Sequence, residues 1–296
     1  MIEEADDPQD RATPAEGEAL GPLRTGWHPL AWLLVGSFVL LVPFGLAARI
    51  ASFIGPLARL TLPVLAAGLA IVTYSVLMRR LARRALPELE AGRWPLETLF
   101  GIGIGGALAV GSAFIVTLLG GYRFIWAPSP PLILFAFLAY YFSGAIVEEL
   151  VFRGLVFQAI EQMSGRWTAL VVTSIFFGAI HFGNPHATVW STVAIACEAG
   201  LLLGAAFLWR RHLGFVVGLH FAWNFAQALL GIAVSGRVSQ GLFKVQLSGS
   251  ELLTGGRFGL ENSLVAVVAS FFISLPMLAL ASRKVTPLPG SQKGIR

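Results

Sequence analysis

Eight long apolar stretches, separated by charged residues or by clusters of proline and glycine, dominate the pattern of the chain. They cover approximately residues 29–48, 56–78, 99–121, 131–150, 168–185, 188–209, 213–234 and 262–281. A helix needs about 20 apolar residues to cross the roughly 30 Å hydrocarbon core of a membrane. The stretches are too long for the roughly ten-residue strands of an outer-membrane barrel. The pattern predicts an all-α, polytopic membrane bundle of about eight transmembrane helices.

The composition agrees with a membrane location. The 296 residues are 56% hydrophobic and 12% charged, and their mean hydropathy is +0.74. Soluble domains average about 25% charged residues. The net charge of +5 comes from arginines between the apolar stretches, so we expect no nucleic-acid binding. The single cysteine, Cys197, has no second cysteine with which to form an intrachain disulfide.

The two ends of the chain are polar. Seven of the 16 acidic residues lie before residue 20, and the first apolar stretch begins only near Pro29. We therefore expect residues 1–28 to form a disordered polar arm, and no cleaved targeting segment is visible. If this arm is cytoplasmic, 15 of the 21 lysines and arginines fall in inner segments and six in outer ones. The positive-inside rule then predicts that both termini are cytoplasmic. The short loops and the high content of Gly, Ala and Arg suggest a multi-pass protein of a bacterial inner membrane, surrounded by lipid.

Charged residues continue the fourth apolar stretch, in Val147-Glu148-Glu149-Leu150-Val151-Phe152-Arg153-Gly154. Successive residues of a helix lie about 100° apart, so Glu148 and Glu149 face different sides. Glu149 and Arg153 are four residues apart and can form an ion pair. This leaves Glu148 free to point into the bundle. The alternative is that all three charges end a span at the cytoplasmic interface.

Three further polar sites lie inside later stretches. Phe177 and His181 share a helical face in the fifth stretch, and His220 and Asn224 do so in the seventh. Each motif alone is also typical of hydrogen-bonded packing between transmembrane helices. Glu198, near the middle of the sixth stretch, has no spaced partner and remains an unexplained buried acid.

The order and spacing of these motifs resemble the CAAX protease and bacteriocin-processing family, also called the Abi family. This family includes the Rce1-type prenyl-protein endopeptidases. The resemblance covers roughly residues 140–226. The apolar pattern predicts N-terminal transmembrane helices over residues 29–125, and the resemblance implies a catalytic core over 126–234. Residues 235–296 would then hold an extracytoplasmic loop, the last transmembrane helix and a basic tail.

The resemblance also implies a glutamate-type intramembrane endopeptidase that cleaves a membrane-associated protein or peptide. Glu148 and His181 would activate a water molecule, and His220 and Asn224 would stabilise the oxyanion. Glu149 and Arg153 match supporting positions. The chemistry is compatible, because a desolvated carboxylate can act as a general base and an asparagine amide donates hydrogen bonds without charge. We expect these side chains to line one water-accessible cavity that opens toward the cytoplasmic half of the membrane.

Three alternatives remain open at this level. Two histidines and a glutamate could instead form a zinc site, although the sequence has no His-Glu-x-x-His motif and Asn224 would be a poor zinc ligand. We therefore expect no cofactor. A transporter or channel could use the buried Glu and His residues as a proton relay. A catalytically silent scaffold could retain the same polar core.

One geometrical difficulty accompanies this interpretation. By counting residues, His220 lies about 10 Å from the inner end of its span, Glu148 lies closer to that side, and His181 lies deeper. Strict spans do not bring these groups together. Either the fourth helix is long and tilted, from about residue 131 to 162, or the segment after Gly154 folds back into the membrane.

Overall fold

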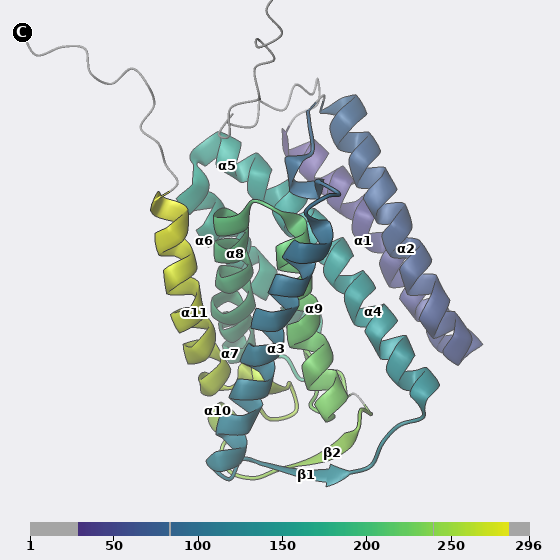
Figure 1. Ribbon diagram of the computed structural model, residues 1–296, viewed down its shortest axis with the longest axis vertical. Helices are drawn as coiled ribbons and strands as arrows, with labels where there is room; N and C mark the ends of the chain where they lie inside the picture. Colours follow the sequence, from purple (N-terminus) through teal and green to yellow (C-terminus); the bar gives the residue numbers. More distant parts are fainter. Residues whose placement is uncertain (1–28, 83, 239, 284–296) are drawn as a thin grey trace, which may run out of the picture.

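The computed structural model describes residues 29–82, 84–238 and 240–283 (Figure 1). The polar arm expected at residues 1–28 and the end of the basic tail lie outside the described residues. The α-helices are α1 Pro29–Ile54, α2 Pro56–Val76, α3 Trp94–Leu118, α4 Pro131–Glu149, α5 Gln158–Ser164, α6 Arg166–Ile180, α7 Val189–Ile195, α8 Leu201–Arg210, α9 Leu213–Leu230, α10 Glu251–Thr254 and α11 Leu264–Arg283.

Shorter helical segments join or extend these helices. Three are π-helical: η1 Leu77–Leu81, η3 Leu150–Phe157 and η5 Ala196–Gly200. Three are 3₁₀ segments: η2 Pro87–Leu89, η4 His181–Gly183 and η6 Leu260–Asn262. Strands β1 Tyr122–Trp126 and β2 Phe243–Leu247 form a small antiparallel sheet in which Tyr122 pairs with Leu247.

Eight helices in the described part of the chain are long and apolar enough to cross a membrane, which confirms the predicted bundle. They are Leu33–Ile54, Pro56–Arg80, Trp94–Leu118, Pro131–Ser164, Arg166–Gly183, Val189–Arg210, Leu213–Leu230 and Leu264–Arg283. The start of α1 and the end of α11 lie at one end of the bundle, at the top of Figure 1, and the β1–β2 sheet lies at the other.

The third span begins five residues earlier than the apolar pattern predicted. Glu97 lies in the first turn of α3 and is 3% exposed. Its carboxylate pairs with Arg93 at 2.8 Å and with Arg210 of α8 at 2.6 Å. Because these two cations neutralise the acid, the helix can begin before it, at Trp94.

The fourth span runs without interruption for 34 residues, from Pro131 through η3 to Ser164. The first of the two arrangements considered above, one long helix, is therefore correct. The apolar pattern predicted that this span ends near residue 150 and that Arg153 is one of the cytoplasmic cations. Both predictions were wrong. Arg153 is 0% exposed inside the bundle, where its pairing with Glu149 allows the helix to continue.

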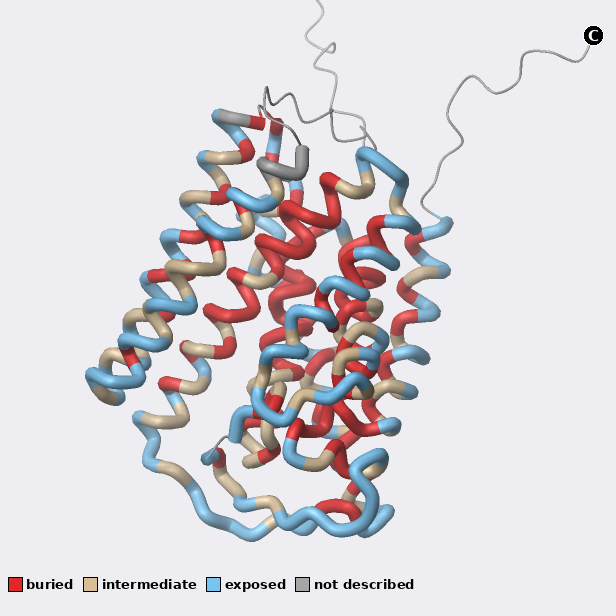
Figure 2. The backbone as a smooth tube through the Cα atoms, turned by 180° about the vertical axis from the view of Figure 1, so that it is seen from behind, coloured by how far each residue is buried: buried red, intermediate tan, exposed pale blue. Residues whose placement is uncertain are grey.

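Helix α9 occupies the centre of the bundle. Its span is 72% buried, whereas the α1 span is only 11% buried. Figure 2 shows buried residues gathered in the middle of the molecule and exposed ones along the outer faces of the peripheral helices. Many of these outer residues are large and apolar, for example Phe38, Leu65 and Phe272, as expected for surfaces that face lipid.

Close contact between α3 and α9 depends on glycine. A Cβ atom at Gly101 or Gly105 would overlap the backbone oxygen of Phe215 or Leu219, and one at Gly218 would overlap the backbone of Thr98. The Gly101-x-x-x-Gly105 motif therefore packs helices within the bundle. This packing fixes the position of the helix that carries His220.

Candidate active site

The long fourth helix presents Glu148 and Glu149 on different sides, as their spacing predicted. The side chain of Glu148 is 30% exposed and lines a cavity, whereas the side chains of Glu149 and Arg153 are 0% exposed. Arg153 Nη1 donates a hydrogen bond of 3.0 Å to Glu149 Oε1, and its Nη2 donates one of 3.2 Å to the Gly200 carbonyl. The expected i,i+4 ion pair is therefore present.

The π-helical segment η3 follows Glu149 directly. Single π turns inside α-helices occur frequently at functional sites, because the wider turn frees backbone groups from the regular ladder. The carbonyl of Gly154 in this segment accepts a hydrogen bond from the Tyr74 hydroxyl of α2 at 2.9 Å. Tyr74 in turn contacts Glu88 and Arg84, which form a buried ion pair. These contacts fix the helix beyond the cavity.

His220 of α9 lies between the two glutamates. Its Nδ1 is 2.8 Å from Glu149 Oε1, and its Nε2 is 3.8 Å from Glu148 Oε2. A carboxylate paired with Arg153 can only accept a hydrogen bond. The Nδ1 atom of His220 therefore carries the ring proton and donates a hydrogen bond to Glu149. The Nε2 atom therefore faces Glu148 and the cavity, and it becomes a donor when the ring is protonated.

His181 begins η4, at the end of α6. Its Nδ1 is 2.7 Å from the Phe177 carbonyl oxygen, which can only accept, so Nδ1 donates and the neutral ring keeps a lone pair on Nε2. The ring centroids of Phe177 and His181 are 4.9 Å apart, and the guanidinium carbon of Arg153 lies over the Phe177 ring, 4.9 Å from its centroid. Phe177 thus packs against both a histidine of the cavity and the buried ion pair.

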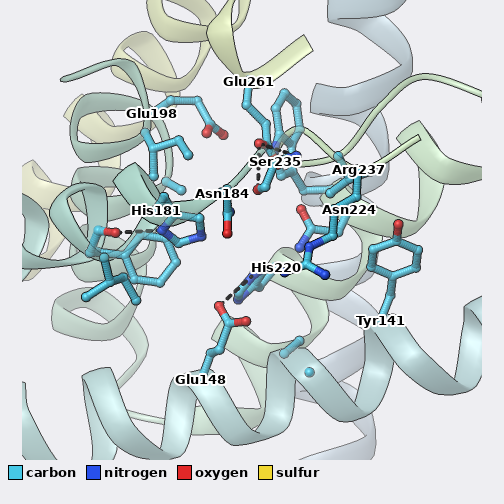
Figure 3. Close-up of a pocket in the computed structure, with 18 of the residues that line it drawn as sticks. Tyr141, Glu148, His181, Asn184, Glu198, His220, Asn224, Ser235, Arg237 and Glu261 are labelled. Atoms are coloured by element: carbon cyan, nitrogen blue, oxygen red, sulfur yellow. Dashed lines mark hydrogen bonds and ion pairs between the residues drawn. The ribbon is translucent and has the colours of Figure 1, made fainter. Parts of the chain in front are cut away.

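One cavity of about 220 Å³ brings the motif residues together. Glu148, His181, His220 and Asn224 all line it, which confirms that they share a cavity (Figure 3). The long fourth helix resolves the difficulty of depth, because it places Glu148 in the interior of a span of about 51 Å rather than at its end. The catalytic roles of these four residues stay predictions.

The wall of the cavity also includes residues that the motifs did not predict. Asn184 follows η4, Ser235 and Arg237 follow α9, and Glu261 precedes α11. Glu198 of η5, which was unexplained in the sequence, lines the cavity as well. Asn184 fell inside the fifth predicted stretch, whereas Ser235, Arg237 and Glu261 fell between the last two. An acid directly before the last predicted stretch was the only signal for Glu261, and it is a weak one.

A tight turn brings Ser235 against Glu261. Val234 and Arg237 form a backbone bridge around it, and Ser235 and Gly236 have positive φ angles of 48° and 79°. A Cβ at Gly236 would overlap the Pro185 carbonyl, so glycine is required there. The Ser235 N–H and hydroxyl donate bonds of 2.9 and 2.8 Å to Glu261 Oε2. Burial nevertheless raises the pKa of Glu261 to about 7, outside the membrane spans.

The position of the loop residues bears on the opening of the cavity. Asn184, Ser235, Arg237 and Glu261 belong to connections that lie toward the end with β1 and β2, and Arg237 is exposed. With cytoplasmic termini this end faces the other side of the membrane. The expected opening toward the cytoplasmic half stays a prediction, because it depends on how the chain is oriented in the membrane.

The arrangement of the possible metal-ligating side chains does not favour a metal site. Among the described residues, no three His, Cys, Asp or Glu side chains are arranged to hold a metal ion together. The His220 ring also directs Nδ1 to Glu149 and Nε2 toward Glu148 at 3.8 Å. Zinc binds nitrogen and oxygen ligands at about 2.0–2.2 Å, so a zinc site would require these side chains to rearrange.

Residues 130–226 match the family of Type II CAAX prenyl endopeptidase Rce1-like proteins. The matched segment begins just before α4, ends in α9 and contains all six motif residues. The resemblance inferred from the motifs is therefore confirmed for this part of the chain. No curated protein matches the sequence.

Proposed function

Because residues 130–226 match the Rce1-like endopeptidases, we propose that the protein is a glutamate-type intramembrane endopeptidase. It hydrolyses a peptide bond of a membrane-associated protein, in a C-terminal tail, a leader or an anchor segment. The observation that carries this proposal is the shared cavity of Glu148, His181, His220 and Asn224 within a helical bundle. A cavity lined by polar side chains can hold the water that hydrolysis requires at membrane depth.

Glu148 and His181 are the proposed bases. His181 donates from Nδ1 to the Phe177 carbonyl, which leaves its Nε2 lone pair able to accept a proton from water. The Glu148 carboxylate is partly exposed in the same cavity and can accept the same proton. The water oxygen then attacks the scissile carbonyl carbon. The proton held by the bases is passed to the amide nitrogen when the C–N bond breaks.

Asn224 and His220 are the proposed oxyanion donors. The Asn224 amide supplies N–H groups without charge, and it lies four residues beyond His220 on the same helical face. The Glu149 carboxylate accepts from His220 Nδ1 and stabilises the protonated ring, whose Nε2–H then points toward the cavity. Removal of one such donor costs about 10²–10³ in kcat, because it acts mainly in the transition state. We expect Asn224→Ala to lower kcat by about this factor, with less change in KM.

The test compares the purified full chain with Glu148→Gln in proteoliposomes that contain peptide substrates and, in parallel, an internal pH-sensitive dye. Glu251→Gln, at an exposed acid of α10, is the matched control. The proposal requires cleavage by the wild type and the control and none by Glu148→Gln. Intact peptides together with a Glu148-dependent proton flux would instead identify a proton-relay transporter, and neither activity would fit a silent scaffold.

Metal dependence is tested on the same preparation. We expect peptide cleavage to survive treatment with a chelator followed by its removal, since the proposed bases and donors are side chains of the chain itself. Near-stoichiometric zinc by elemental analysis, with activity lost on its removal and restored on its return, would overturn the roles given to His181 and His220. It would leave the endopeptidase assignment in place.

A further inference from the structure

Two buried carboxyl groups line the cavity opposite Glu148. Glu198 of η5 is 1% exposed, and Glu261 of η6 is 4% exposed. Both belong to the wall of the cavity, and Figure 3 shows them on the side of the cavity away from Glu148. The proposed hydrolysis uses neither of them.

The Glu198 carboxyl has an unsatisfied polar atom. Its Oε2 is buried and meets no hydrogen-bond partner among the described residues. A buried polar group without a partner is costly, so such groups in native proteins call for a specific explanation. Because Glu198 lines a cavity, a bound molecule that donates a hydrogen bond would give its carboxyl group a partner.

Glu261 lacks a cationic partner. Its two hydrogen bonds come from the N–H and the hydroxyl of Ser235, and both fall on Oε2. Within the described ranges, neither Glu198 nor Glu261 forms an ion pair with a lysine, arginine or histidine. Both carboxyl groups are buried and line the same cavity, so their charges repel each other with little screening by water when both are ionised. A positive charge between them would remove this repulsion.

We propose that Glu198 and Glu261 form a subsite that takes a cationic side chain, lysine or arginine, of the peptide substrate near the scissile bond. This inference rests on the proposed endopeptidase function. An ammonium or guanidinium group has several N–H donors, so it can bond to more than one carboxylate oxygen at once. A neutral donor would satisfy one oxygen but would leave the repulsion between the acids.

The state of Glu261 supports this choice. Its pKa of about 7 means that Glu261 is partly protonated near neutral pH. A cationic side chain would displace that proton and take its place between the acids. The cavity of about 220 Å³ is large enough for a long side chain next to a peptide bond at Glu148.

The test measures binding without cleavage. Blocked hexapeptides with a single lysine, placed at each position in turn, are compared with peptides that carry uncharged norleucine at the same position. Binding is measured by fluorescence anisotropy to the purified full chain with Glu148→Gln, which also removes the charge of Glu148 from the comparison. Glu198→Gln and Glu261→Gln are then added singly to this chain, with Glu251→Gln as the matched control.

We expect the lysine peptide to bind at least tenfold more tightly than its norleucine partner at one position. This preference should disappear with Glu198→Gln and with Glu261→Gln and persist with Glu251→Gln. Equal binding of lysine and norleucine at every position overturns the subsite, and this comparison needs neither Gln substitution to fold. A preference that survives both substitutions also overturns it.

The same peptides given to the wild-type protein separate this inference from the proposed function. Cleavage without a lysine preference would overturn the subsite and leave the endopeptidase in place. Selective binding of lysine peptides without any cleavage would support the subsite as a ligand site and would overturn the endopeptidase.

Discussion

The Glu149 carboxylate holds two other groups of the site in position. Its Oε1 accepts from Arg153 Nη1 at 3.0 Å and from His220 Nδ1 at 2.8 Å. Arg153 connects this pair to the Gly200 carbonyl of η5. One buried ion pair therefore fixes the tautomer of His220 and joins the fourth helix to the sixth span. Among the described residues Glu148 has no comparable contact, since its nearest ionic partner there is His220 Nε2 at 3.8 Å.

This difference predicts separate effects of neighbouring substitutions. Glu149→Ala or Arg153→Ala leaves a buried charge without its partner, which costs about 3–5 kcal/mol of unfolding free energy, and activity should fall with stability. Glu148→Gln should abolish cleavage with little loss of stability. Thermal unfolding in detergent measures the first effect and a cleavage assay the second. Equal losses of stability at Glu148 and Arg153 would contradict this division of roles.

Glu261 predicts a pH dependence of stability. Burial raises its folded-state pKa from 4.5 to about 7, so the folded protein binds more protons than the unfolded one between these values. Stability therefore falls as pH rises from about 4.5 to 7, by at most about 3 kcal/mol from this group. Its surroundings modify the pKa: Ser235 and His220 lower it, and Glu148 raises it.

The measurement is the melting temperature between pH 5 and 8 for the wild type and Glu261→Gln. We expect the substitution to flatten the decline, because glutamine does not titrate, whereas Glu251→Gln should leave it unchanged. If the decline is as steep in Glu261→Gln as in the wild type, Glu261 is not the group that causes it.

The motif residues were predictable from the sequence, but the rest of the cavity wall was not. Spacing alone placed Glu149 next to Arg153 and His220 on one face with Asn224, because these are contacts within single helices. The bond between Glu149 and His220 joins positions 71 residues apart. Ser235, Arg237 and Glu261 are positioned by a turn and by the packing of loops, which hydrophobic periodicity does not describe.

At the level of elements, the fourth helix shows why charge counts can misplace a boundary. The predicted stretch ended near residue 150 and left Arg153 beyond it, yet Arg153 lies in η3 of a 34-residue helix. A charge stops a transmembrane helix only when it must reach the interface. Here Glu149 lies one turn before it, and a backbone carbonyl of η5 is within reach, so Arg153 stays buried.

The contact between α3 and α9 predicts a contrast between neighbouring glycines. Gly101→Ala and Gly105→Ala would each place a Cβ against the α9 backbone, which cannot move without displacing His220, so both should lower the melting temperature and the activity. Gly103→Ala on the same helix meets no atom within 4 Å and should be neutral or slightly stabilising. Unfolding in detergent tests this. Similar losses at Gly103 and Gly101 would contradict the proposed contact.

On the scale of the whole molecule, the eight spans return the end of α11 to the end of the bundle where α1 begins (Figure 1). Without Arg153, the inner segments hold 14 lysines and arginines and the outer segments hold six. This difference still favours cytoplasmic termini. The β1–β2 sheet and the loops near the cavity would then face the other side. Composition could predict this number of spans, but the side on which the cavity opens depends on loops.

Cysteine labelling in intact cells tests this orientation. In a Cys197→Ala background, a cysteine at Ser248, an exposed position after β2, should react with a membrane-impermeant maleimide. A cysteine at Ser291 in the basic tail should react only after permeabilisation. The reverse pattern would invert the topology and place the loop wall of the cavity in the cytoplasm.

The central claim is that Glu148 catalyses proteolysis within the membrane. Its most direct test is a survey of new C-termini in membrane fractions from cells that produce equal amounts of the wild type or Glu148→Gln. We predict a set of cleaved membrane-associated proteins that appears with the wild type and is absent with Glu148→Gln. The same set of termini in both samples would contradict the claim.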